Sequence, residues 1–279
     1  MVHIVTEIFA FDFMRHAFIA GTIAAILAGI VGYFVVIRHL AFAGHALGHI
    51  GFAGATGAVL FGVTPIIGQL FLTVLAAFGM GFLGERISKS DIAIGVMLAF
   101  SLGLGTLFLH FYTAYAGQAT AILFGDLLGV SDQAIKLIII LTLLSLFALS
   151  FIARPLLFTS LEPELAEAKG ISLQLIAICN LMIIAVAVTI ASQVVGVLLV
   201  FTLLIGPAAI AQQWTSQFWP GLWVSIIVAI LTVWLGIVCA WFSDWPISFW
   251  ISAIIFVLYL LSRLKIQIIG LKFLPINRS

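Results

Sequence analysis

The sequence predicts an all-α, polytopic membrane protein. Hydrophobic residues make up 64% of its 279 residues and charged residues only 8%, whereas a soluble domain typically carries about 25% charged residues. The apolar residues are gathered in long stretches, and a helix needs about 20 mostly apolar residues to cross a bilayer. We therefore expect one transmembrane domain over residues 1–279 with eight or nine membrane-spanning helices.

Nine apolar segments are candidates for these helices. The second of them is rich in small residues, such as Gly48, Gly51 and Gly54, which let helix backbones approach closely in lipid. This segment is therefore expected to pack among other helices. The nine segments are approximately residues 14–37, 42–62, 66–84, 91–111, 133–153, 171–190, 193–213, 219–243 and 246–262.

Basic residues predict the orientation, because Lys and Arg are enriched in cytoplasmic loops. With the loop 85–91 in the cytoplasm, most of the basic residues also fall on the cytoplasmic side. The N-terminus is then outside, and residues 263–279 form a cytoplasmic tail. The basic residues on this side are Arg38, Arg86, Lys89, Arg154, Lys169, Arg263, Lys265, Lys272 and Arg278.

Two connections are long enough to have structure of their own. Residues 112–132 should be extracytoplasmic and contain the apolar stretch AILFGDLL, which is predicted as a short helix dipping into the protein. Residues 154–170 should be cytoplasmic and become sharply acidic. Pro163 suits the first turn of a helix and Gly170 suits its end. A helix of about two turns outside the bilayer is expected between them.

The stretch GHALGHIGFAG contains the candidate metal ligands, His45 and His49. Residues four apart lie on one face of a helix, so both imidazoles can face one ion. Imidazole is a common ligand for zinc and other divalent transition metals, and polar groups at membrane depth often mark a transport pathway. The alternative is that both histidines form hydrogen bonds to neighbouring helices.

Five stretches of the chain, in order, resemble the permease subunits of the ABC-3 family, which import zinc, manganese or iron in bacteria. The resemblance covers about residues 14–262. The stretches are FVVIRHLAFAGHALGHIGFAG, AILFGDLLGVS, LEPELAEAKGI, VVGVLLVFTLLIGPAAIA and SDWPISFWI.

The resemblance implies roles for two of these stretches. Residues 161–170 look like the coupling helix that docks on the nucleotide-binding subunit, with Glu162, Glu164, Ala166 and Gly170 at the interface. His49 matches a pathway histidine of the family, and His45 stands where the family usually has Asp. Replacing carboxylate by imidazole favours zinc over manganese as the metal carried.

The resemblance also implies partners and location. A homodimer of the permease would work with two ATPase subunits and a periplasmic or lipid-anchored metal-binding protein in the bacterial inner membrane. The metal would be the transported substrate, with no permanently bound cofactor. The chain has no soluble block long enough for catalysis, so it is not expected to be an enzyme, and its net charge of +1 gives no indication of nucleic-acid binding.

Rival classes are a stand-alone secondary metal transporter or channel, an intramembrane metalloenzyme and a haem protein. Secondary transporters usually place charged residues at mid-membrane, and no carboxylate lies clearly within a predicted span. The zinc protease motif needs Glu after its first histidine, but Ala46 fills that position. Two histidines one turn apart on one helix cannot supply opposite axial ligands of one haem.

Overall fold

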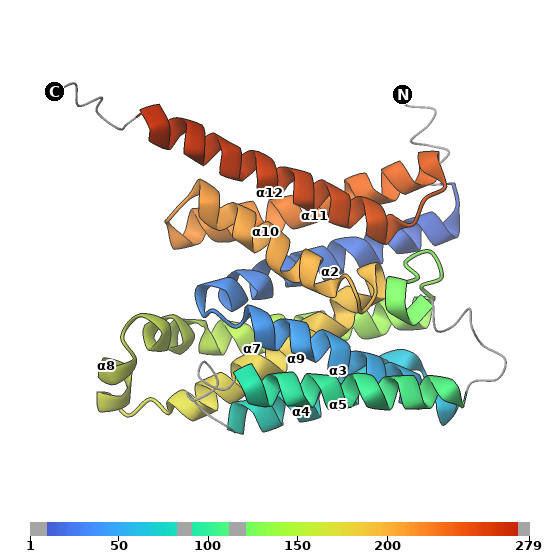
Figure 1. The fold of residues 1–279 in the computed structure, drawn as a ribbon, viewed down its shortest axis with the longest axis horizontal. Helices are drawn as coiled ribbons and strands as arrows, with labels where there is room; N and C mark the ends of the chain where they lie inside the picture. Colours follow the sequence, from blue (N-terminus) through green and yellow to red (C-terminus); the bar gives the residue numbers. More distant parts are fainter. Residues whose placement is uncertain (1–9, 83–90, 112–120, 273–279) are drawn as a thin grey trace.

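The computed structural model describes residues 10–82, 91–111 and 121–272 as a bundle of long helices (Figure 1). Within these ranges, the side chains of residue 91 and of residues 265–272 are not described. The predicted all-α fold is confirmed for these residues, whereas the basic residues Arg86 and Lys89 and the end of the tail lie outside them. The helices are α2 (Asp12–Ile37), α3 (Ala41–Leu60), α4 (Pro65–Phe82), α5 (Asp91–His110), α7 (Asp132–Leu161), α8 (Pro163–Ala168), α9 (Leu173–Val195), α10 (Val200–Trp214), α11 (Phe218–Ser243) and α12 (Ile247–Lys272).

A long helix overlaps each of the nine predicted spans. Within the residues that the structure describes, seven helices are long and apolar enough to cross a membrane, namely α2, α4, α5, α7, α9, α11 and α12. Helices α3 and α10 do not meet the length and hydropathy expected of a membrane-spanning helix. Helix α10 has only 15 residues, and the histidines and glycines of α3 lower its mean hydropathy.

Three helix ends differ from the prediction. Helix α7 continues through Pro155 to Leu161 rather than ending near residue 153. Helix α12 continues to Lys272, so the first part of the predicted tail, residues 263–272, is helical. The break predicted near residues 190–193 is wrong, because α9 runs on to Val195 and the chain leaves the helix at Gly196.

The actual break between α9 and α10 pairs with the segment that precedes α7. Gly196 and Gly125 have φ angles of +78° and +80°, a region that glycine adopts without steric cost. The N–H groups of Val197 and Leu198 donate to the carbonyls of Ile122 and Leu123 at 3.2 Å. Of the stretch AILFGDLL, which is predicted as a short helix, only residues 121–124 are helical, and residues 112–120 of the same connection lie outside the described residues. This pairing satisfies backbone groups that the broken helix leaves without intrahelical partners.

Helix α9 lies at the centre of the bundle, where it contacts α2, α3, α4, α7 and α10. Helices α3 and α4 cross closely because glycines face each other there. A Cβ at Gly54 would collide with the carbonyl oxygen of Gly68, and the reverse also holds. Small residues therefore permit the tight packing predicted for α3, whose residues from Ile50 to Ala58 are all buried.

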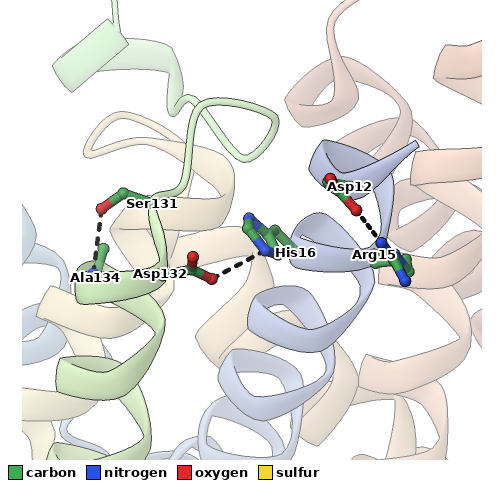
Figure 2. A network of polar contacts seen from close by, with 6 residues as sticks. All are labelled: Asp12, Arg15, His16, Ser131, Asp132 and Ala134. Atoms are coloured by element: carbon green, nitrogen blue, oxygen red, sulfur yellow. Dashed lines mark hydrogen bonds and ion pairs between the residues drawn. The ribbon is translucent and has the colours of Figure 1, made fainter.

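The first turns of α2 and α7 lie side by side (Figure 2). His16 Nε2 lies 3.0 Å from Asp132 Oδ1, and Arg15 pairs with Asp12 on α2 itself. Ser131 caps α7 by accepting a hydrogen bond from the N–H of Ala134. Helix α8 lies at the other end of the bundle, towards which α2 runs (Figure 1).

Candidate metal pathway and docking helix

His45 and His49 lie together on α3, as their spacing predicts. Their rings meet edge to face with centroids 4.6 Å apart, and both side chains are partly buried. A zinc–imidazole bond is about 2.0–2.1 Å long, so two rings this close can share one ion. The geometry is therefore compatible with joint ligation of a metal.

The surroundings of the pair are mainly apolar. The ring of His45 meets the ring of Phe201 on α10 edge to face, with centroids 5.2 Å apart. The Nδ1 atom of His49 is buried and has no hydrogen-bond partner. Buried polar atoms are rarely left in that state. The orphaned nitrogen speaks against the alternative in which this atom bonds to a neighbouring helix.

The described part of the chain offers no third ligand. Within it, no group of three or more His, Cys, Asp or Glu side chains is placed to hold a metal ion. Structural zinc sites are almost always four-coordinate. The pair by itself is therefore half of such a site.

A cavity of about 550 Å³ lies between the later part of α3, the start of α4 and the end of α9. Its wall includes Ala55 of α3 and the polar side chains of Gln69, Asp126, Ser192 and Gln193. Ala55 is six residues beyond His49, about 9 Å along the helix axis. The cavity therefore brings polar groups close to the helix that carries the histidine pair.

Sequence reasoning missed the polar network at this cavity. Gln69, which is 1% exposed, donates from Nε2 to Ser192 Oγ at 2.6 Å. Gln193 Nε2 donates to Gln69 Oε1 at 3.3 Å. The predicted spans 171–190 and 193–213 put Gln193 at the start of a helix, where a polar side chain needs no partner within the protein. Only its true place, inside the last turn of α9, brings it to Gln69.

The predicted short helix is present as α8, and its ends are those the sequence indicates. Pro163 opens it, and Gly170, at φ +78°, follows its end. The N–H of Ile171 donates to the carbonyl of Ala166 at 3.0 Å, and the N–H of Gly170 donates to that of Glu167 at 2.8 Å. These bonds satisfy terminal carbonyls in the manner of a glycine cap.

The residues expected at a docking surface divide into two groups. Glu162, Glu164 and Gly170 are exposed, together with Leu161 at 77% and Leu165 at 47%. Ala166 is fully buried, so its side chain faces the helix bundle and packs α8 against it. Among the four residues expected at the interface, Ala166 is thus the one whose side chain is covered by the chain itself.

The fold and these features define a multi-pass membrane protein with an acidic helix at one end of its bundle. The model of the ABC 3 transport family matches residues 10–266. The chain belongs to the ABC 3 transport family, and it is a permease of the metal-transporting ABC type in the bacterial inner membrane.

Individual relatives agree with this assignment. The manganese import system permease protein ScaB of Streptococcus parasanguinis is 29% identical over 228 residues, 81% of each chain. The manganese transport system membrane protein MntC of Listeria monocytogenes is 30% identical over 210 residues, 74% of each chain. PsaBC from Streptococcus pneumoniae, solved in complex with Fab, has a chain with a TM-score of 0.83 at 25% identity, covering 94% of both chains.

Proposed function

We propose that this permease imports a divalent transition metal, zinc first, through a pathway that contains His45 and His49. The observation that carries the proposal is the edge-to-face histidine pair on α3 with its orphaned buried nitrogen. A metal ion at that nitrogen would remove the cost of leaving it without a partner.

Two copies of the chain would complete the site. Each copy supplies two imidazoles, and two pairs facing each other across a two-fold axis give four. That number suits tetrahedral zinc. The complete site would exist only when the two copies are close, so a motion that separates them would release the ion.

Energy for transport would come from separate ATPase subunits docked at α8. The exposed Glu162 and Glu164 are available to basic groups of a partner, and the exposed Leu165 is available for apolar contact. A periplasmic or lipid-anchored metal-binding protein would deliver the ion to the opposite end of the bundle. In the alternative, a stand-alone secondary transporter or channel, the exposed acidic helix α8 would have no partner to bind.

Manganese is the second candidate cargo, and iron the third. The ScaB and MntC relatives are named for manganese. Against this, imidazole nitrogen suits zinc, whereas manganese prefers carboxylate and other oxygen ligands. Among the described residues, no Asp or Glu side chain forms a metal-binding group with His45 and His49. The absence of a carboxylate ligand there favours zinc over manganese.

The test is metal uptake into vesicles that contain the permease, its ATPase and its metal-binding protein. Zinc, manganese and iron are supplied separately, with and without ATP. His45→Ala and His49→Ala are compared with wild type, and His110→Ala is the matched control, because His110 is exposed at the end of α5.

We expect ATP-dependent zinc uptake that falls at least tenfold in both pathway variants and is unchanged in His110→Ala. Normal uptake by His45→Ala and His49→Ala in assembled complexes would mean that the pair is a packing feature. Faster uptake of manganese than of zinc by the wild-type protein would replace zinc by manganese as the cargo.

A further inference from the structure

Arg38 lies between the start of the histidine helix α3 and the end of α7, which leads to α8. It follows α2, and its guanidinium Nη1 donates to Thr159 Oγ1 at 3.2 Å and to the carbonyl of Leu156 at 3.4 Å. Both acceptors lie in the last turns of α7, and Thr159 is only 5% exposed. Hydrogen bonds from a charged donor are stronger than neutral ones, so this is a firm connection between α2 and α7.

On one side, Arg38 is part of a tight turn that leads directly to the histidine pair. His39 has φ +56°, and the N–H of Leu40 donates to the carbonyl of Val35 at 2.9 Å. Helix α3 begins at the next residue, Ala41, and His45 follows one turn later. A displacement of Arg38 therefore acts on the start of the helix that carries both histidines.

On the other side, the acceptors of Arg38 belong to the segment that carries α8. Glu162 is both the last cap of α7 and the first cap of α8. The ammonium of Lys169 lies 5.2 Å from the ring centroid of Phe158, which fastens the end of α8 back to the last turn of α7. A force on α8 is therefore passed to residues 156–161 without an intervening loop.

Pro155 separates this segment from the rest of α7. Proline has no N–H to donate to the carbonyl four residues earlier, and such positions are where helices bend. The end of α7 can thus move with α8 while the membrane-spanning part stays in place. The hydrogen bond from Arg38 to Thr159 then connects the moving end of α7 to the turn that precedes α3.

We propose that the Arg38–Thr159 contact is the mechanical link that transmits movement of α8 to the histidine helix α3. Arg38 and Thr159 are positioning residues in this scheme, since they act through α3 and α8 and not on the metal itself. The inference rests on the proposed function, because it assigns α8 to the ATPase and α3 to the metal.

The experiment measures metal ions transported per ATP hydrolysed in vesicles that hold the complete complex. Thr159→Val removes the hydroxyl acceptor at nearly constant volume, and Thr159→Ser keeps it. Thr142→Val is the matched control, because Thr142 lies on the same helix, is also 5% exposed and has a hydroxyl without a hydrogen-bond partner. Arg38→Met removes the donor.

We expect Thr159→Val and Arg38→Met to lower this ratio about fivefold, with ATP hydrolysis and complex assembly retained. The double variant should be no worse than Arg38→Met alone, because losing the guanidinium already removes the hydrogen bond that Thr159→Val breaks. Thr159→Ser and Thr142→Val should transport with the wild-type ratio.

Wild-type ratios in Thr159→Val and Arg38→Met would overturn the link while leaving the proposed function standing. An equal loss of transport per ATP in Thr142→Val would also overturn the link, because the loss would then follow from replacing any buried threonine of α7 and not from breaking the contact with Arg38. Absence of ATP-driven uptake in the wild type would overturn the proposed function, and the link with it.

Discussion

Gln69 on α4 donates a 2.6 Å hydrogen bond to the hydroxyl of Ser192 on α9, and both side chains are almost completely buried. The same glutamine accepts a hydrogen bond from Gln193. One level away, the hydroxyls of Thr73 and Thr189 lie 3.1 Å apart on the same two helices. A ladder of polar contacts therefore fixes the register of α4 against the central helix.

Gln69→Leu should destabilise the permease moderately. Hydrogen bonds between membrane helices contribute on average about 0.6 kcal/mol and at most about 1.7 kcal/mol, and this change breaks two of them. We expect a loss of about 1–2 kcal/mol in the free energy of unfolding, measured by denaturant titration in detergent. A stability equal to that of wild type would show that the contacts are energetically neutral.

Gly196→Ala should be far more damaging than a glycine substitution elsewhere in the bundle. Gly196 has φ +78°, and an added Cβ would collide with the backbone at residues 123–125. We expect a loss above 2 kcal/mol, on the order of other strained or overpacked sites. Thermal unfolding in detergent measures it.

The matched control is Gly103→Ala, since a Cβ at Gly103 meets nothing within 4 Å. There the higher helix propensity of alanine should leave the stability unchanged or raise it by up to about 1 kcal/mol. Equal losses at both glycines would contradict the account of the α9–α10 break.

His45→Asp should change the metal preference without abolishing transport. A carboxylate adds an oxygen ligand and a negative charge beside His49, which favours manganese relative to zinc. We expect the ratio of zinc to manganese uptake to fall on the order of tenfold in reconstituted vesicles. His45→Asn supplies oxygen without the charge and separates the two effects. An unchanged ratio in His45→Asp would remove this residue from metal selection.

Charge reversal on α8 should weaken the docking of the ATPase subunit. Glu162→Arg combined with Glu164→Arg replaces two exposed carboxylates by cations. We expect the affinity for the ATPase to fall about tenfold or more and to become less sensitive to salt, because rim charges act through screened attraction. Surface plasmon resonance on the permease in nanodiscs measures both.

Lys136→Glu is the control for that experiment, because Lys136 is exposed in the first turns of α7 at the opposite end of the bundle. It should bind the ATPase as wild type does. Undiminished binding by the α8 variant would place the docking surface elsewhere.

Much of the candidate site was predictable because it depends on short-range geometry. The four-residue spacing of His45 and His49 fixes their common face on any α-helix, and the structure places their rings together. Pro163 and Gly170 predicted the ends of α8 by the same local logic. The burial of Ala166 could not be predicted in the same way, because spacing alone does not tell which side of a six-residue helix meets the bundle.

The sequence by itself determined the membrane class, the helical fold and the approximate place of every long helix, because apolar length and helix-terminal residues act locally. Only the tertiary structure decided that α9 runs to Val195, that the following break pairs with residues 122 and 123, and that Arg38 reaches Thr159. The last two features join residues more than 70 positions apart in the sequence. Hydrogen-bond partners at such separations depend on which helices pack together. A local sequence pattern does not determine this packing, so it cannot predict the partners.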